Sequence, residues 1–176
     1  MILECQINGH ICILPNYIAR FLLKASSMYV GTIDLNGKPR IQPVLFVNEF
    51  GKCSLAFLIN KQSKIAMNLQ KNPNITLTTD STHPTDSLQN KGIMIEAISQ
   101  QFNSENIVRE CFDNLQKKYN SDVITKILGI DIILKYIKIT AVPIKIVYWK
   151  GPFFKKFTCD QRRKQKLLKK KENSEI

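Results

Sequence analysis

Residues 60–73 read Asn-Lys-Gln-Ser-Lys-Ile-Ala-Met-Asn-Leu-Gln-Lys-Asn-Pro, and this stretch decides the fold. The residues before it, 53–59, are nearly all apolar, as expected of a strand covered on both faces in a barrel wall or at a dimer interface. Within the stretch, Ile65, Ala66 and Leu69 recur at helical spacing, and the Asn-Pro pair ends the helix. The sequence therefore predicts a junction at which a buried strand is followed directly by a helix.

The junction is chemically suited to one phosphate group. The first turn of a helix offers free backbone N–H groups and the positive end of the helix dipole. Ser63 adds a hydroxyl group, and Lys61 and Lys64 add positive charge. The segment lacks the glycines with which a Walker loop wraps a triphosphate. Taken alone, it is better explained as an ordinary helix start with solvated lysines, so its meaning depends on its surroundings.

Around this junction the pattern predicts a mainly β protein, a small antiparallel barrel of about six strands with flanking helices. Asn36-Gly37 marks a tight turn between the first two strands, because both residues tolerate positive φ. Pro143 indicates an edge or a bulge in the last strand. The predicted strands comprise residues 28–34, 39–48, 53–59, 74–79, 92–102 and 136–148, and the predicted helices comprise residues 15–25, 61–72, 103–119 and 121–129.

Short motifs follow one another in a fixed order along these elements. They are Val30-Gly31-Thr32-Ile33-Asp34, Gly37-x-Pro39, Pro43-Val44, Ser63-Lys64, Asn68-Leu69-x-x-Asn72-Pro73 and Ile95-Glu96-Ala97. In this order, over residues 15–102, they resemble the pyridoxamine 5′-phosphate oxidase-like superfamily of FMN-binding split β-barrels. The sequence departs from that pattern at Gln62, where a second basic residue is common, and at Ala97, where glycine is common. The resemblance implies a flavin bound in a cleft between the two subunits of a homodimer.

The resemblance also implies which residues contact the cofactor. Residues 40–44 meet the edge of the flavin ring mainly through their backbone, and the end of the apolar strand lines the ring. The serine and lysine of the junction hold the phosphate, with help from Lys61 or Arg40, and Asn68 lies behind them. Trp149 is a candidate to stack on the partner's flavin, although a core or interface position explains a lone tryptophan better. The implied set is Arg40, Gln42, Pro43, Val44, Leu58, Ile59, Lys61, Ser63, Lys64, Asn68 and Trp149.

The implied function is that of an FMN-dependent oxidoreductase that transfers hydride to or from a small organic substrate. The flavin carries that chemistry, so no dedicated catalytic side chain is expected. A deazaflavin-dependent reductase on the same fold is an alternative. The uncharged Gln62 favours FMN, because the deazaflavin tail is longer and anionic. A further alternative is a non-catalytic protein that binds flavin or haem, or that binds nucleic acid through its tail.

Length and charge predict one domain and a basic tail. The 176 residues suffice for a single core, which we assign to residues 1–157. The net charge is +12, and residues 155–176, with nine basic and three acidic side chains, contribute half of it. The tail at residues 158–176 could dock on nucleic acid or on an anionic surface. It lacks the interleaved aromatic side chains that stack on bases, so a solubilising terminus explains it better.

The remaining composition favours a cytoplasmic protein without a metal centre. The two histidines, His10 and His83, form no ligand pattern, and no two cysteines have the spacing of a zinc or redox site. We expect free thiols, with Cys53 and Cys111 packed in the interior. No apolar run reaches the roughly 18 residues of a membrane-spanning helix, and no signal-peptide pattern begins the sequence.

Overall fold

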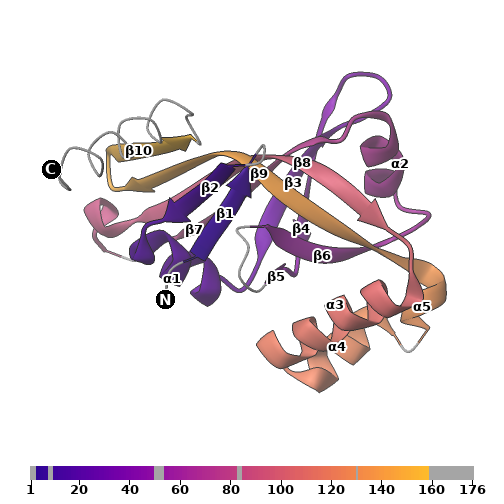
Figure 1. The fold of residues 1–176 in the computed structure, drawn as a ribbon. Helices are drawn as coiled ribbons and strands as arrows, with labels where there is room; N and C mark the ends of the chain where they lie inside the picture. Colours follow the sequence, from indigo (N-terminus) through magenta and orange to yellow (C-terminus); the bar gives the residue numbers. More distant parts are fainter. Residues whose placement is uncertain (1–2, 8–9, 50–53, 83–84, 130, 159–176) are drawn as a thin grey trace, which may run out of the picture.

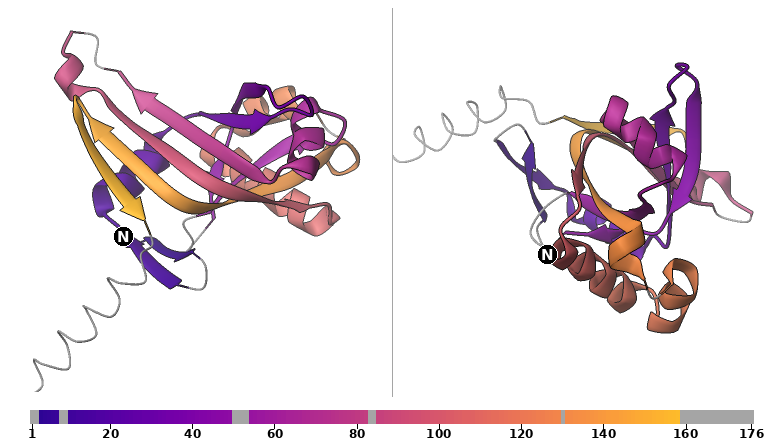
Figure 2. Two further views of the ribbon diagram at one scale, coloured as in Figure 1. Left: turned by 90° about the horizontal axis from the view of Figure 1, so that it is seen from above. Right: turned by 90° about the vertical axis from the view of Figure 1, so that its right-hand side faces the viewer.

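The computed structural model describes residues 3–7, 10–49, 54–82, 85–129 and 131–158. Its main body is an eight-stranded antiparallel sheet, in which seven strands follow the order β4-β3-β7-β8-β9-β6-β5 and β10 pairs with β9. The sheet curls round on itself into a half-barrel (Figure 1; Figure 2, right). Its strands are β3 (Met28–Ile33), β4 (Pro39–Val44), β5 (Val47–Asn48), β6 (Leu55–Asn60), β7 (Asn74–Ser81), β8 (Lys91–Phe102), β9 (Tyr136–Lys150) and β10 (Phe153–Thr158). The predicted mainly β barrel is confirmed.

Helices flank this sheet, and a separate hairpin precedes it in the chain (Figure 1). The hairpin pairs β1 (Leu3–Ile7) with β2 (His10–Leu14). Helix α2 follows β6 directly. Helices α3, α4 and α5 come between β8 and β9 in the chain and gather at one end of the sheet. The helices are α1 (Asn16–Lys24), α2 (Lys64–Lys71), α3 (Glu105–Lys118), α4 (Ser121–Leu128) and α5 (Ile132–Lys135), with a short 3-10 helix η1 (Ser87–Gln89). Four residues are too few to give a periodic signal, so α5 was not predicted.

The apolar strand β6 separates two hydrophobic clusters. Leu55, Phe57 and Ile59 belong to the main core inside the curled sheet. The alternate residues Ala56 and Leu58 belong to a second cluster, which the helices α3, α4 and α5 cover. Because successive side chains of a strand point to opposite faces, a strand between two clusters must be apolar throughout. The prediction that this strand is covered on both faces is confirmed, and the second cover is helical.

The predicted strand 39–48 is wrong in one respect, because it is two strands, β4 and β5. The chain leaves the ladder at Phe46. Both backbone polar groups of Phe46 bond to the hydroxyl of Tyr119, the residue that follows α3, and not to a neighbouring strand. A long-range contact therefore breaks the strand at a point where the local sequence, Leu45-Phe46-Val47, favours its continuation.

Pro143 marks a bulge, as the sequence indicated. The register between β8 and β9 shifts between Glu96 and Ala97, and Pro143 lies opposite Ala97. The pairing of β9 with β6 ends at Ala141, and its pairing with β10 begins at Lys145. A proline, which has no N–H group to donate, thus occupies the stretch of β9 that lacks a second neighbouring strand.

Three sequence-based expectations lie outside the described residues. Cys53 and His83 are among them, and so is the basic tail beyond Thr158. Cys111 is described and lies buried in the second cluster, where burial raises the pKa of its thiol to about 12. The expectation that Cys111 is a packing residue is therefore confirmed.

Candidate functional site

A groove lies where β4 and β6 meet the start of α2. Its volume is about 250 Å³. One side is formed by the end of β4 and the end of β6, and the other by residues of α3, α4 and the start of β9. The lining residues are Gln42, Pro43, Val44, Leu45, Leu58, Ile59, Asn60, Ser63, Ile65, Leu115, Ile127, Leu128 and Tyr136. Most of these side chains are apolar, so the groove suits a flat, largely apolar group.

The groove brings together a subset of the residues predicted from the sequence. Those that line it are Gln42, Pro43, Val44, Leu58, Ile59 and Ser63. Lys64 follows directly at the first position of α2 and is exposed. Leu45 and Asn60 also line the groove and are chain neighbours of predicted residues, so an extended motif could have included them. Leu115, Leu128 and Tyr136 come from the part of the chain where the sequence motifs end, and no local signal marks them.

The start of α2 is organised by two hydrogen-bonded side chains. The Ser63 hydroxyl accepts a hydrogen bond from the Ala66 N–H at 3.2 Å and donates one to the Asn60 carbonyl at 2.7 Å. The Asn60 side chain accepts the Gln62 N–H at 2.8 Å. Within the described part of the chain, the N–H groups of the next two residues, Lys64 and Ile65, have no acceptor. Ser63 is thus the helix cap, and two backbone donors beside a free ammonium group remain for an anion.

The other two cations proposed for this site are engaged elsewhere. The Arg40 guanidinium bonds to the Asp34 carboxylate, with Nε and Nη2 both 3.0 Å from Oδ2. The same carboxylate accepts the backbone N–H groups of Asn36 and Lys38 at 2.9 Å each, and the bond from Lys38 is the main cause that lowers the Asp34 pKa. The Lys61 ammonium donates to the Ile133 carbonyl on α5 at 3.3 Å. Lys64 is therefore the cation of the predicted set that is available beside the groove.

Asn68 and Trp149 lie away from the groove. Asn68 is buried, and its Nδ2 donates to the Thr32 hydroxyl at 3.1 Å, which attaches α2 to β3. Trp149 is opposite Gly92 in the β8–β9 ladder, and a Cβ atom on Gly92 would come within 1.9 Å of the indole ring. The indole therefore packs flat over a glycine in its own subunit. Its stacking on a partner's cofactor stays a prediction.

The backbone of β4 is a further potential contributor to the site. β4 is at the end of the strand order and pairs with β3 alone among the described strands. The N–H and C=O groups that point away from β3 along residues 39–44 consequently have no strand partner. An edge strand in this position can bond the rim of a planar ligand without using side chains.

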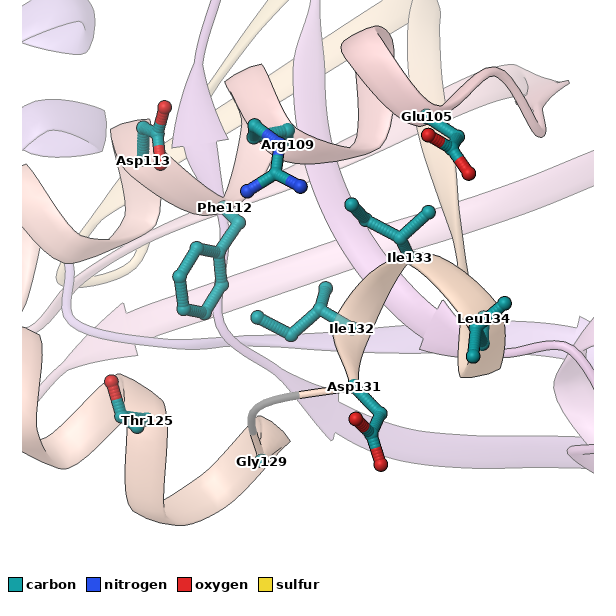
Figure 3. Close-up of a pocket in the computed structure, with 10 residues that line it drawn as sticks. All are labelled: Glu105, Arg109, Phe112, Asp113, Thr125, Gly129, Asp131, Ile132, Ile133 and Leu134. Atoms are coloured by element: carbon teal, nitrogen blue, oxygen red, sulfur yellow. The ribbon is translucent and has the colours of Figure 1, made fainter.

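A second hollow lies among α3, α4 and α5, with a volume of about 480 Å³. Figure 3 shows the Arg109 guanidinium directed toward Phe112 and Ile132, with Asp113 pointing away from it. The Arg109 side chain makes no hydrogen bond or ion pair with any described residue. None of the residues singled out from the sequence lines this hollow. Its described lining residues come from helices and the turns between them, so it offers no free strand edge.

Other kinds of site find no support in the described residues. In that part of the chain, no three histidine, cysteine, aspartate or glutamate side chains cluster as a metal site would require. The described helices include none that is long and apolar enough to cross a membrane.

The curled antiparallel sheet with flanking helices, opened by a groove at a strand–helix junction, defines a split β-barrel protein. A family model described as pyridoxamine 5′-phosphate oxidase matches residues 14–147, and the chain belongs to this family. No curated protein sequence matches the chain.

Solved structures share the fold at low sequence identity. Campylobacter jejuni ChuZ aligns with a TM-score of 0.69 and 16% identity over 81% of this chain and 58% of that one. A second match is a Clostridium acetobutylicum protein of the pyridoxinephosphate oxidase family, related to general stress protein 26 of B. subtilis. It aligns with a TM-score of 0.62 and 18% identity over 82% of this chain and 94% of that one. HutZ, the haem storage protein of Vibrio cholerae, aligns with a TM-score of 0.62 and 15% identity over 80% of this chain and 96% of that one. At these identities the likeness concerns the fold.

Proposed function

We propose that the protein is an FMN-dependent oxidoreductase that transfers hydride to or from a small organic substrate. The observation that carries the proposal is the position of the groove. It runs from the free backbone edge of β4 to the start of α2, where the N–H groups of Lys64 and Ile65 have no acceptor among the described residues. A planar ring with a phosphate tail matches both ends of this groove at once.

Each part of the groove has a distinct role in this proposal. FMN, when bound, supplies the hydride chemistry. The apolar side chains of Val44, Leu58 and Leu128 exclude water from one side of the groove, and the β4 edge orients the ring. The helix start and the Lys64 ammonium hold the phosphate by charge-assisted hydrogen bonds. Tyr136 adds a hydroxyl group at the groove wall.

The charge at the junction favours FMN over a deazaflavin coenzyme. Arg40 is paired with Asp34, Lys61 is bonded to α5, and Gln62 is uncharged. The cation that remains, Lys64, matches one phosphate group better than a longer anionic tail. A deazaflavin-dependent reductase stays the alternative on the same fold.

Haem is the other ligand to be tested, because HutZ, which shares the fold, is a haem storage protein. Among the described residues that line the groove there is no histidine, cysteine or methionine. Tyr136 is the lining residue of a type that ligates haem iron. This composition favours a flavin. If the protein binds haem, its absorption spectrum after reconstitution with haem should show a Soret band. A protein that binds only flavin lacks this band.

The proposal includes a homodimer, and the outer face of the sheet supports it. Gly31 lies opposite both Ile41 and Thr76, and Thr76 lies opposite Glu96, so these residues share one face. That face carries a hollow of about 450 Å³. Apolar side chains from 36% to 70% exposed gather on it, and a second copy would cover them. They are Tyr29, Ile33, Ile41, Ile98 and Ile144.

A pair of substitutions at Ser63 tests the phosphate site. Asp and Asn both cap helices well, so Ser63→Asp and Ser63→Asn preserve α2 while differing in charge. Titration with FMN should give at least ~10-fold weaker binding for the aspartate variant than for the asparagine variant, because like charges repel at the helix start. Riboflavin, which lacks the phosphate, should bind both variants equally.

The same preparation tests the activity. Reduced FMN bound to the protein should pass hydride to at least one acceptor in a panel of quinones, nitroaromatics and pyridinium compounds. Purified protein that binds no FMN at micromolar concentration would refute the cofactor proposal. Bound flavin that reduces no acceptor would favour a storage role.

A further inference from the structure

A third hollow lies where α1 meets the ends of β7 and β8. Its volume is about 590 Å³, within the range of sites for small organic ligands. It shares no lining residue with the groove and shares only Tyr29 with the hollow on the outer sheet face. The lining residues are Tyr17, Arg20, Phe21, Lys24, Ala25, Ser26, Ser27, Tyr29, Thr79, Asp80, Ser81, Lys91 and Tyr148.

One face of α1 presents aromatic and cationic side chains to this hollow. Tyr17, Arg20, Phe21 and Lys24 recur at the spacing of one helical face. The opposite face of the helix is buried in the core, which fixes the orientation of the exposed one. The arrangement is therefore set by the packing of the helix and not by the mobility of a loop.

The positive charges of the hollow form no ion pair with any described residue. The side chains of Arg20, Lys24 and Lys91 form no hydrogen bond or ion pair with any described residue. Asp80 is the carboxylate among the lining residues, so the lining carries a net positive charge. Like charges one helical turn apart, as at Arg20 and Lys24, repel each other and disfavour the helix. A phosphate or carboxylate ligand would remove this repulsion.

Aromatic rings lie beside these charges. The Tyr17 and Tyr148 rings meet edge to face with centroids 5.1 Å apart, and Phe21 meets Tyr148 at 6.2 Å. The Lys155 ammonium lies 5.8 Å from the Tyr17 ring centroid and adds a further cation at the rim. Tyr17 is 41% exposed, so part of its ring remains accessible to a flat ligand.

We propose that this hollow binds an aromatic phosphomonoester of about the size of a nucleoside monophosphate. Arg20, Lys24 and Lys91 hold the phosphate, and the Tyr17 ring packs against the aromatic group. The Asp80 carboxylate accepts hydrogen bonds from sugar hydroxyls, the role that an acidic residue has toward ribose in dinucleotide-binding folds. The site is separate from the flavin groove and does not depend on the function proposed for it.

Calorimetric titration with adenosine 5′-monophosphate tests the proposal on the full chain. The nucleotide should bind at least ~10-fold more tightly than either adenosine, which lacks the phosphate, or inorganic phosphate, which lacks the ring. The double variant Arg20→Gln/Lys24→Gln should weaken nucleotide binding by at least ~10-fold. Both side chains are exposed, so the variant should fold as the parent does. Lys126→Gln, an exposed lysine on α4, is the matched control and should change nothing.

Three results would overturn the proposal. One is equal affinity for the nucleotide and for inorganic phosphate, because it would show no contribution from the rings. Another is undiminished nucleotide binding in the Arg20→Gln/Lys24→Gln variant. The third is nucleotide binding that is lost in Lys64→Ala and kept in the double variant, because the nucleotide would then occupy the flavin groove.

Discussion

The hydroxyl group of Tyr119 is hydrogen-bonded to both backbone polar groups of Phe46. It accepts the Phe46 N–H at 3.2 Å and donates to the Phe46 carbonyl at 2.8 Å. Through this contact the last residue of the α3 region replaces a neighbouring strand at the break between β4 and β5. Because Leu45, the preceding residue, lines the groove, the contact also fixes one end of the proposed cofactor site.

Removing this hydroxyl group should destabilise the protein. In Tyr119→Phe, a half-buried N–H and a half-buried C=O lose their partner, which should lower the free energy of unfolding by about 1–3 kcal/mol. Urea denaturation measures this change. Tyr136→Phe is the matched control, because Tyr136 is also half-buried and its hydroxyl has no hydrogen-bond partner among the described residues. Equal stability of the two variants would show that the contact contributes nothing.

Lys118, which precedes Tyr119, should make stability depend on pH. Its Nζ lies 3.5 Å from the Phe46 ring centroid and has no hydrogen-bond partner in the described part of the chain. Burial lowers the pKa of this ammonium from 10.5 to about 8. Between these two values the unfolded chain binds the proton and the folded chain does not, so this group makes stability rise with pH.

The substitution Lys118→Met isolates this effect. Urea denaturation at pH 7, 8, 9 and 10 should show the wild type gaining stability relative to the variant above pH 8. Taking the difference between the two proteins cancels the titration of all other groups. The cation–π contact with Phe46 also disappears in the variant and shifts its stability by a constant amount below pH 8. Parallel curves over the whole range would contradict the assigned pKa.

Gly92 should not tolerate a larger residue, because of Trp149. A Cβ atom at position 92 would lie 1.9 Å from the indole ring, so Gly92→Ala must displace the ring or the strand. We expect a loss of about 1–3 kcal/mol of stability, as for other overpacked sites. Trp149 is the sole tryptophan, so its fluorescence spectrum should shift as well.

Gly31→Ala is the control for this substitution. The nearest atom to a Cβ at position 31 is the Thr76 carbonyl oxygen at 3.5 Å, an ordinary contact. Its melting temperature should therefore stay near that of the wild type. If both glycine variants melt alike, the packing of the indole on Gly92 does not limit stability.

The sequence predicted those parts of the site whose residues lie close together along the chain. The sequence predicted a helix over residues 61–72, and α2 begins in the structure at Lys64 with Ser63 as its cap. Strand, cap and helix follow one another within a few residues, so this junction is encoded locally. The pairing of Arg40 with Asp34 was not predicted, although it follows from the predicted Asn36-Gly37 hairpin, which brings these two residues together. The bond from Lys61 to Ile133 joins positions 72 residues apart, and no local pattern encodes it. The Tyr119–Phe46 contact, at a separation of 73, is missed for the same reason.

Lys64 should carry most of the side-chain contribution to phosphate binding. Lys64→Ala should weaken FMN binding by about 1.5–3 kcal/mol, roughly 10- to 150-fold, if the ammonium makes a charge-assisted contact. Lys71→Ala, at the other end of the same helix, changes the net charge equally and should leave the affinity unaltered. Flavin fluorescence quenching gives both dissociation constants. If both substitutions weaken FMN binding equally, Lys64 acts only through the net charge of the protein and makes no direct contact with the phosphate.

Ile41 should be decisive for the proposed dimer. It is 70% exposed on the edge strand β4 and belongs to the apolar face described above. It is also a chain neighbour of the groove residue Gln42. Ile41→Glu would bury a charge between two copies, so light scattering after size exclusion should report a monomer. FMN affinity should fall with it, because the proposed cofactor lies between the subunits. Leu134→Glu, on α5 and 74% exposed, introduces the same charge away from that face and should stay dimeric. If Ile41→Glu remains dimeric with unchanged affinity, another surface joins the subunits.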